Sequence, residues 1–303
     1  MEGGNGSQLF GKFQGFWCLG EYIPSIISFQ THFQALDEDI VIATMPKVGT
    51  TWLKALVFSI VNRHRYTLSD TPLNLSNPHD LVPYFELFLY ANGQVPDLTS
   101  TIPSPRLFAT HIPYPSLAES IKQSNTKIVY VTRNPLDAIV SFWYHVRAKP
   151  ESSDWPLEEC FEMFCGGEEW FGPFWNHVLG YWKQSLEKPN KVLFLRYEDL
   201  KKNPVSEIGK IADFTGFPFS DEEEGGGVVQ GIADFCSFSN LKDLPINKTG
   251  ILGWANTNTM PTNAFFRKGE VGDHLNHLSP SQIQRFTKIL QDKLSESGLS
   301  LTN

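Results

Sequence analysis

The sequence predicts a single α/β domain in which helices cover both faces of a central parallel β-sheet. Three apolar runs rich in β-branched residues, at 39–44, 126–132 and 191–196, predict buried strands, and a turn and a helical segment follow each one. Strands that alternate with helices in this way favour parallel pairing. The 303 residues would fit one large domain or two smaller ones, but no low-complexity linker or internal repeat divides them.

The expected elements follow from hydrophobic period and capping residues. In chain order they are a strand at 39–44 and a helix at 50–63, a strand at 126–132 and a helix at 136–145, and a strand at 191–196 and a helix at about 203–215. At the end of the chain, Ser279 followed by Pro280 and Gln282 predicts the start of an amphipathic helix.

Three segments lack this pattern. Residues 69–115, rich in proline and aromatic side chains, are expected to form loops with one short helix. The acidic, glycine-rich segment 221–227 is expected to be a solvated surface turn. The polar segment 246–268 is longer than most loops of compact domains, which indicates a functional cover or a mobile segment.

Composition and charge restrict the classes of function. Hydrophobic residues make up 41% of the chain and aromatic residues 13%, which is typical of a folded globular protein. The net charge of −8 argues against a dedicated nucleic-acid binder, although local cations and helix N-termini can still bind a small anion. Neither a signal peptide nor a run of about 18 apolar residues occurs. We therefore expect a cytoplasmic protein with no nucleic-acid or membrane partner.

The four cysteines are too few and too scattered for a disulfide framework, and no cysteine–histidine cluster has a zinc-ligand spacing. Cys160 and Cys165 lie in an aromatic stretch and are expected to be buried thiols without redox chemistry. No metal site is predicted.

The strongest chemical signal is the turn between the first strand and its helix. A strand-to-helix turn exposes backbone N–H groups at the positive end of the helix dipole. Here Lys47 adds a full charge, and Thr50 and Thr51 add hydroxyl donors, so the segment predicts an anion-binding turn. It differs from the nucleotide P-loop, because Lys47 precedes the only glycine, Gly49. A tight turn with an exposed lysine is the alternative.

Two further basic segments support an anion site. Arg133 directly follows the second strand, and its planar guanidinium suits a phosphate, while Ser141 lies two helical turns further on. A surface ion pair and a packing serine would explain them equally well. Arg267-Lys268-Gly269 ends the long polar segment and, taken alone, would be a solvated charge run.

Together these segments resemble the cytosolic sulfotransferases, the plant-type soluble enzymes that use 3′-phosphoadenosine 5′-phosphosulfate (PAPS). The resemblance runs from about Phe29 to Lys293 through PKVGTTWLKAL, YVTRNPLDAIVSFWYH, LRYEDLKKNP, CSFSNLK and FFRKGEVGD, in this order. It implies one domain over 29–303, with a P-loop-like fold of the nucleotide-kinase type. Residues 1–28 would form a partly flexible N-terminal segment.

The resemblance also implies how the donor PAPS and its product, adenosine 3′,5′-bisphosphate (PAP), are bound without a metal. The residues that it assigns to the 5′-phosphosulfate are Lys47, Val48 through its backbone, Gly49, Thr50 and Thr51. Those assigned to the adenine are Trp52, Tyr197, Cys236 and Phe238, and those assigned to the 3′-phosphate are Arg133, Ser141, Arg267, Lys268 and Gly269. Core packing alone is the alternative for Trp52 and Tyr197.

His111, within Ala-Thr-His-Ile-Pro-Tyr, would be the general base by the same resemblance. Its ordinary pKa of about 6.5 suits proton transfer near pH 7, and a structural histidine is the alternative. Lys47 would stabilise charge on the leaving phosphate. The acceptor would be a small hydrophobic alcohol or phenol, such as a flavonoid or steroid, walled by residues 81–89, 111–115, 142–145 and 246–265.

Three positions depart from the family pattern. Val48 replaces a serine or threonine and removes a hydroxyl from the turn, His274 stands where tryptophan is usual, and Leu275 where lysine is usual. The family's C-terminal dimer signature is also absent, so a monomer is expected. Two alternative functions remain: a nucleotide-binding protein without turnover, suggested by Val48 and Leu275, and an ATP-dependent kinase, which the missing P-loop sequence disfavours.

Overall fold

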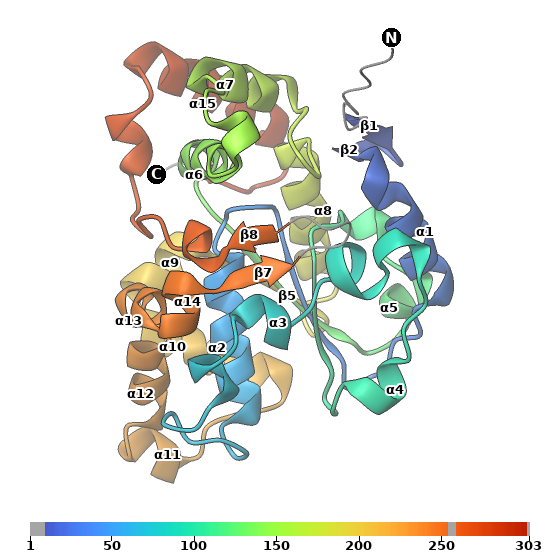
Figure 1. Cartoon of the computed structure of the whole chain (residues 1–303), viewed down its shortest axis with the longest axis vertical. Helices are drawn as coiled ribbons and strands as arrows, with labels where there is room; N and C mark the ends of the chain where they lie inside the picture. The colour runs from blue at the N-terminus through green and yellow to red at the C-terminus, as the bar shows by residue number, and fades with distance from the viewer. Residues whose placement is uncertain (1–9, 254–258, 302–303) are drawn as a thin grey trace.

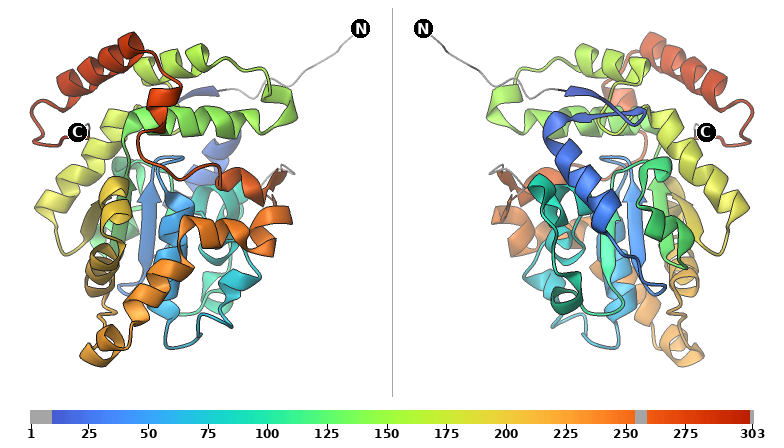
Figure 2. Two further views of the ribbon diagram at one scale, coloured as in Figure 1. Left: turned by 90° about the vertical axis from the view of Figure 1, so that its left-hand side faces the viewer. Right: turned by 90° about the vertical axis from the view of Figure 1, so that its right-hand side faces the viewer.

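A computed structural model describes residues 10–253 and 259–301. Its centre is a four-stranded sheet in the order β4-β3-β5-β6, and all three strand pairs are parallel (Figure 1). The strands are β3 (Ile40–Thr44), β4 (Leu107–Thr110), β5 (Lys127–Thr132) and β6 (Val192–Arg196). Helices lie on both sides of this sheet (Figure 2), which confirms the expected α/β architecture.

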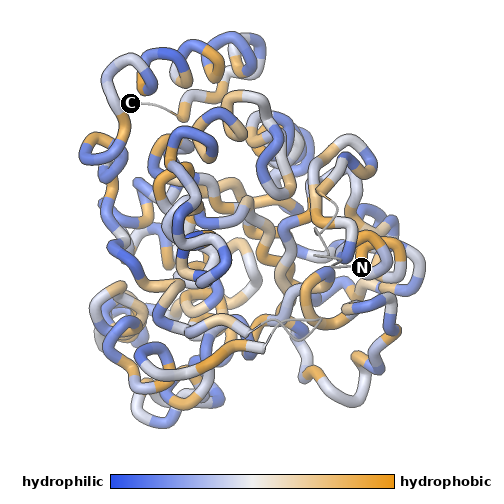
Figure 3. The backbone as a smooth tube through the Cα atoms, turned by 45° about the horizontal axis from the view of Figure 1, so that its top comes forward, coloured by the Kyte–Doolittle hydropathy of each residue, from blue (hydrophilic) through white to orange (hydrophobic). Residues whose placement is uncertain are grey.

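The three strands expected from the sequence are present to within one residue, because each run is apolar on both faces. Every residue of β3 is buried, as is all of β5 except Lys127. The helices that follow them are α2 (Thr50–Asn62), α6 (Pro135–Arg147), and the pair α9 (Tyr197–Lys202) and α10 (Pro204–Thr215). Figure 3 shows hydrophobic stretches in the interior and alternating hydrophilic turns along the outer helices.

The expectation of mere loops with one short helix at 69–115 is wrong. This region contributes β4, which extends the central sheet beyond β3, together with short helices α3 (Pro78–Leu81) and α4 (Leu98–Thr101) and the single-turn π-helix η3 (Phe85–Leu89). All four residues of β4 are buried. A strand of four buried residues shows no alternation of apolar and polar residues. The surrounding prolines therefore indicated loops.

The segment at 221–227 is also more ordered than expected. Asp221–Gly225 forms a short helix, α11, whose N-terminus has a capping box between Ser220 and Glu223. The carboxylate of Glu223 pairs with Arg63 at 2.7 Å. Acidic residues in the first turn of a helix interact favourably with its dipole, which explains why this acidic run is helical.

The N-terminal segment is partly built into the domain. Strands β1 (Phe10–Phe13) and β2 (Phe16–Leu19) form an antiparallel hairpin that leads into α1 (Ile23–His32), and Phe16 and Ile26 are buried in the core. The expected domain boundary at residue 29 falls inside α1. The expected flexibility of this segment also concerns residues 1–9, which lie outside the described residues.

The remaining elements cover the sheet and one end of the molecule. They are α5 (Glu119–Gln123), α7 (Leu157–Gly166), α8 (Phe174–Glu187), α12 (Val228–Phe235), α13 (Phe238–Asp243), α14 (Pro245–Thr249), the antiparallel pair β7 (Ile251–Gly253) and β8 (Thr259–Pro261), and α15 (Pro280–Leu294). As expected, Ser279 and Gln282 form a capping box at the start of α15. Cys160 and Cys236 are buried free thiols.

Candidate active site

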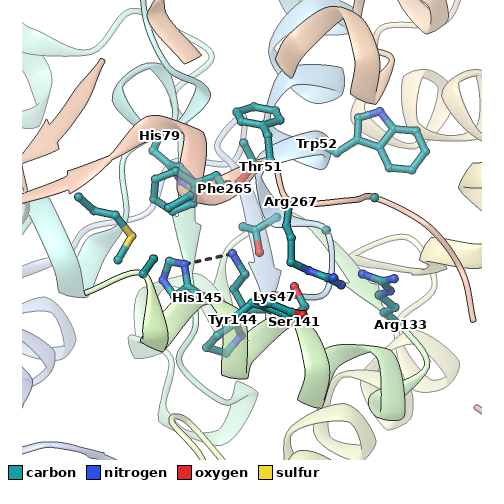
Figure 4. Close-up of a pocket in the computed structure, with 18 of the residues that line it drawn as sticks. Lys47, Thr51, Trp52, His79, Arg133, Ser141, Tyr144, His145, Phe265 and Arg267 are labelled. Carbon is teal, nitrogen blue, oxygen red and sulfur yellow. Dashed lines mark hydrogen bonds between the residues drawn. The ribbon is translucent and has the colours of Figure 1, made fainter. Parts of the chain in front are cut away.

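The site is a cavity of about 320 Å³ at the carboxyl ends of the central strands. Its walls come from the turn after β3, the middle and last turn of α6, the start of α9, the 3₁₀ helix η8 (Thr262–Phe265) and the segment 266–269 (Figure 4). The carboxyl edge of a parallel sheet is where open α/β folds bind ligands, since strand-to-helix turns converge there.

The turn after β3 is shaped to expose backbone N–H groups. Lys47 has a φ of 69° and Gly49 one of 117°, and no side chain caps the first turn of α2. A Cβ atom at Gly49 would lie 2.7 Å from Tyr197 Cδ2, so only glycine fits. Helix α2 therefore begins with its first amides and the Thr51 hydroxyl beside the cavity, which is the geometry of an anion site.

Several cations line this cavity, and two of them lower the pKa of Lys47. Desolvation, and then the charges of Arg267 and Arg133, lower the pKa of Lys47 to about 7. Such a shift means that the ammonium form of Lys47 is poorly compensated in the protein alone. The arrangement favours an anionic ligand, because an anion would remove this repulsion.

Arg133 is fixed by contacts on three sides. Its guanidinium donates to Asp137 Oδ2 at 3.2 Å and to the backbone carbonyl of Glu270, and it lies 4.6 Å from the centre of the Tyr197 ring. Burial alone would raise the pKa of Asp137, but hydrogen bonds from His274 and the charge of Arg133 lower it to about 2. The carboxylate is therefore ionised and holds Arg133 at the cavity wall.

His274 anchors the segment that closes the site. Its backbone N–H and its Nδ1 lie 3.0 Å and 2.8 Å from Asp137 Oδ1, and the N–H of Gly272 donates to the other oxygen at 2.9 Å. Where the family has tryptophan, this chain thus uses a hydrogen-bonded histidine to join the segment to α6. Leu275 is 69% exposed and lies outside the cavity.

The basic tripeptide also lines the cavity. Arg267 pairs with Asp273 at 2.7 Å and lies over the Tyr144 ring, and Lys268 pairs with the same carboxylate at 2.6 Å. Gly269, with a φ of 66°, accepts a hydrogen bond from the Tyr197 hydroxyl through its carbonyl at 2.9 Å. Its backbone passes so close to Phe238 that a Cβ atom would lie 2.4 Å from the ring.

His111 lies at the end of β4 and is buried beside Lys47 in the same cavity. Its Nδ1 is 2.7 Å from the carbonyl oxygen of Thr44. A carbonyl can only accept, so Nδ1 carries the proton and Nε2 keeps its lone pair. Burial lowers the pKa of His111 to about 3 despite this hydrogen bond, which leaves the ring neutral.

Most residues assigned from the sequence converge on this one cavity. Those that line it are Lys47, Gly49, Thr50, Thr51, Trp52, His111, Arg133, Ser141, Tyr197, Phe238, Arg267, Lys268 and Gly269. The side chains of Val48 and Cys236 do not line it. The expected contact of Val48 is through its backbone and does not depend on its side chain. Val48 is fully buried in the hydrophobic core, and Cys236 Sγ lies 3.4 Å from Ser59 Oγ, where burial raises its pKa to about 12.

The structure adds contacts that sequence reasoning missed, at His79, which had no expected role, and at His145, which was expected only as part of the acceptor wall at 142–145. His79 contacts Thr51 Oγ1 at 3.0 Å and the buried amine of Lys54 at 2.9 Å, and His145 lies 3.3 Å from Lys47 Nζ. A signal for His145 existed, because it follows Ser141 by four residues and such residues share one helix face. Tyr22, Trp170 and Phe171 also line the cavity, although no expected acceptor wall included them.

Metal and membrane sites were examined over the residues that the structure describes. In these ranges no group of three histidine, cysteine, aspartate or glutamate side chains could hold a metal ion. No described helix is long and apolar enough to cross a membrane.

Comparisons with known proteins agree with this geometry. Residues 37–298 match the family model described as "Sulfotransferase domain". Cytosolic sulfotransferase 15 of Arabidopsis thaliana is 50% identical over 294 residues, which cover 95% of this chain and 80% of that relative. A crystal structure of an Arabidopsis thaliana sulphotransferase is 38% identical, with a TM-score of 0.75, and the match covers 97% of this chain and 89% of that chain.

The mouse sulfotransferase SULT7A1, solved in complex with PAP, is 27% identical with a TM-score of 0.74, and the match covers 96% of each chain. These likenesses confirm the expected P-loop-like α/β fold and the expected enzyme class. The cytosolic names of the plant relatives agree with the expected location. The chain belongs to the plant cytosolic sulfotransferase family.

Proposed function

We propose that the enzyme transfers the sulfuryl group of PAPS to the hydroxyl of a small hydrophobic acceptor, with His111 as the general base. The observation that carries this proposal is the meeting of two environments in one cavity. One wall holds the cations Lys47, Arg133 and Arg267, while the other is aromatic, and the unprotonated Nε2 of His111 is left beside them.

The residues of the cationic wall fit the donor. Arg133 Nε, Arg267 Nε and Trp52 Nε1 are buried donors for which the described residues provide no hydrogen-bond partner. Buried donors are almost always satisfied in folded proteins, so orphans in a cavity indicate groups that a ligand completes. Arg133, Ser141 and Arg267 to Gly269 would hold the 3′-phosphate, and Trp52, Tyr197 and Phe238 the adenine. The mouse relative binds PAP, which supports this assignment.

The chemistry follows from the protonation states of the two central side chains. The donor supplies an activated sulfuryl group, whose transfer needs in-line geometry and a cation at the departing phosphate. His111 Nε2 would accept the proton of the acceptor hydroxyl as its oxygen attacks sulfur. The Lys47 ammonium would stabilise the charge that develops on the leaving oxygen, and the Thr50 and Thr51 hydroxyls with the first amides of α2 would orient it.

The acceptor side favours a flat apolar molecule. Tyr22, Tyr84, Trp170, Phe171 and Phe265 line it, and aromatic walls with few polar groups suit a phenol or a steroid-like alcohol. A nucleotide-binding protein without turnover is less well supported, because neither Val48 nor Leu275 removes a group from the cavity. We also expect the enzyme to act as a monomer.

The test is sulfate transfer from labelled PAPS to a panel of phenols, flavonoids and steroids, with sulfated products identified by mass spectrometry. His111→Ala should reduce turnover by roughly 10²–10⁴, the usual contribution of general-base catalysis, and keep the PAP dissociation constant within a few-fold. A folded His111→Ala enzyme with near-wild-type turnover on a true acceptor would contradict the assignment of the base. A structural histidine would instead lower stability and PAP binding together.

A further inference from the structure

The amine of Lys47 is held by a histidine that no family motif assigned. His145 Nδ1, on the last turn of α6, lies 3.3 Å from Lys47 Nζ, and Figure 4 shows Lys47 extending toward it and away from Arg133. The same ring hydrogen-bonds the backbone carbonyl of Ala264 on η8. His145 therefore connects the turn after β3 with α6 and with the segment that borders the acceptor side.

The contact with Lys47 fixes the role of each ring nitrogen. Nδ1 lies 3.3 Å from the amine of Lys47, and an ammonium can only donate, so Nδ1 acts as the acceptor. In a neutral ring the proton is then on Nε2. In this tautomer the His145 ring has no lone pair left for an acceptor hydroxyl. Proton transfer thus belongs to His111, whose Nε2 keeps its lone pair, and His145 serves another purpose.

The surroundings of Lys47 show what that purpose is. The titratable and charged side chains that face its amine are Arg133, Arg267, His79, His111 and His145. The two arginines repel the ammonium, and the Phe265 ring, 5.4 Å away, offers it only a weak cation–π contact. Burial keeps His145 neutral by lowering its pKa, so its Nδ1 can stabilise the ammonium form. A hydrogen bond to the charged form favours that form.

We propose that His145 is a positioning residue for Lys47, whose amine it holds, as the ammonium, at the boundary between the donor and acceptor sides of the cavity. The inference rests on the proposed role of Lys47 in sulfuryl transfer. It differs from the roles assigned so far, because in this proposal His145 acts through the lysine that it contacts.

The test compares two substitutions at position 145 with one control. His145→Phe keeps a planar ring but removes the acceptor, whereas His145→Asn restores a carbonyl oxygen near the place of Nδ1. Arg147→Ala, a change on the same helix at a half-buried side chain that does not line the cavity, is the control. We expect His145→Phe to lower kcat about tenfold or more, the effect of one hydrogen bond to a charged group. PAP should bind within a few-fold of wild type, and His145→Asn should recover most of the loss.

A pH readout separates positioning from mere packing. Without its acceptor the ammonium is less stable, so the alkaline limb of the kcat–pH profile should move to lower pH in His145→Phe and return in His145→Asn. Arg147→Ala should leave the profile unchanged. If both variants lose activity equally and the alkaline limb of their kcat–pH profiles stays at the wild-type pH, His145 is a packing residue and the proposal is wrong.

A measurement without turnover keeps this proposal distinct from the proposed function. NMR titration of ¹³C-labelled lysine in the donor-free protein should show a lower Lys47 pKa in His145→Phe than in wild type, with recovery in His145→Asn. An unchanged Lys47 pKa would overturn the role of His145 even if sulfate transfer is established. A shifted pKa in a protein that transfers no sulfate would instead refute only the proposed function.

Discussion

Val48→Ser is the substitution for which the structure reverses the expectation from the sequence. The family pattern has a hydroxyl residue here, which suggested that serine would strengthen the anion-binding turn. In the structure the Val48 side chain has no exposed surface and belongs to the hydrophobic core behind that turn. We therefore expect Val48→Ser to destabilise the protein and to leave PAP affinity unchanged or lower.

The magnitude follows from what the core loses. Removing the two buried methyl groups of Val48 costs about 1.6 kcal/mol at about 0.8 kcal/mol per group. A hydroxyl buried without a partner adds about 1–3 kcal/mol. The sum is about 2.6–4.6 kcal/mol, and in a domain of this size about 2 °C of melting temperature accompanies each kcal/mol. The expected decrease is therefore about 5–9 °C. Val48→Ala should show the methyl part alone, and Val48→Thr mainly the hydroxyl part.

Differential scanning fluorimetry with and without PAP measures both quantities in one experiment. The three variants should rank with serine the least stable, and PAP should raise each melting temperature by about the same amount as in wild type. If Val48→Ser instead keeps the wild-type melting temperature and binds PAP several-fold more tightly, the side chain faces the ligand and the placement of Val48 is wrong.

Three further predictions concern the donor site. PAP at 100 times its dissociation constant should stabilise the protein by about 2.7 kcal/mol and AMP far less, with Arg133→Ala weakening the PAP effect much more than Arg147→Ala does. The Lys47 pKa of about 7 in the free protein must rise when an anion binds, so PAP affinity should be greatest below pH 7 and fall as the pH rises through it. Calorimetry at pH 8 in two buffers should show proton uptake that Lys47→Met abolishes. Gly269→Ala, with a Cβ 2.4 Å from Phe238, should weaken PAP binding at least tenfold in a fluorimetric titration, and wild-type affinity would contradict the close approach.

The sequence was sufficient to predict the successive strand–turn–helix units of the fold. Each long strand of the sheet is an apolar run followed by a turn and a helix, so β3, β5 and β6 were predicted to within one residue. Strand β4 was missed because four residues give no period, and the helix at Asp221–Gly225 because its signal is a capping box within a glycine-rich run. The parallel pairing of β4 with β3 is a contact between segments far apart in the chain, which no local pattern contains.

Only part of the candidate site could be assigned from the sequence. Turn residues such as Lys47 and Arg133 could be assigned because they follow strands whose carboxyl ends must meet. Which way a side chain points within such a turn cannot be read from its type, and Val48 shows the consequence. The contact of His145 with Lys47 was missed for a different reason, although His145 itself lay in the expected acceptor wall at 142–145. The lysine lies 98 residues earlier in the chain, and no local pattern connects the two positions.

The cavity contains cations that pair with carboxylates, which we propose bind the donor, and one that does not, which we propose acts in catalysis. Arg133 pairs with Asp137 and Arg267 with Asp273, so these two cations are compensated and fixed before a ligand arrives. None of the ion pairs among the described residues includes Lys47. The hydrogen-bond contact of its amine is with the neutral His145. A cation without a fixed counter-ion responds most strongly to new negative charge, because no carboxylate competes for it. In the proposed mechanism the uncompensated lysine would thus lie where charge develops during transfer, and the paired arginines would lie where the donor's charge is constant.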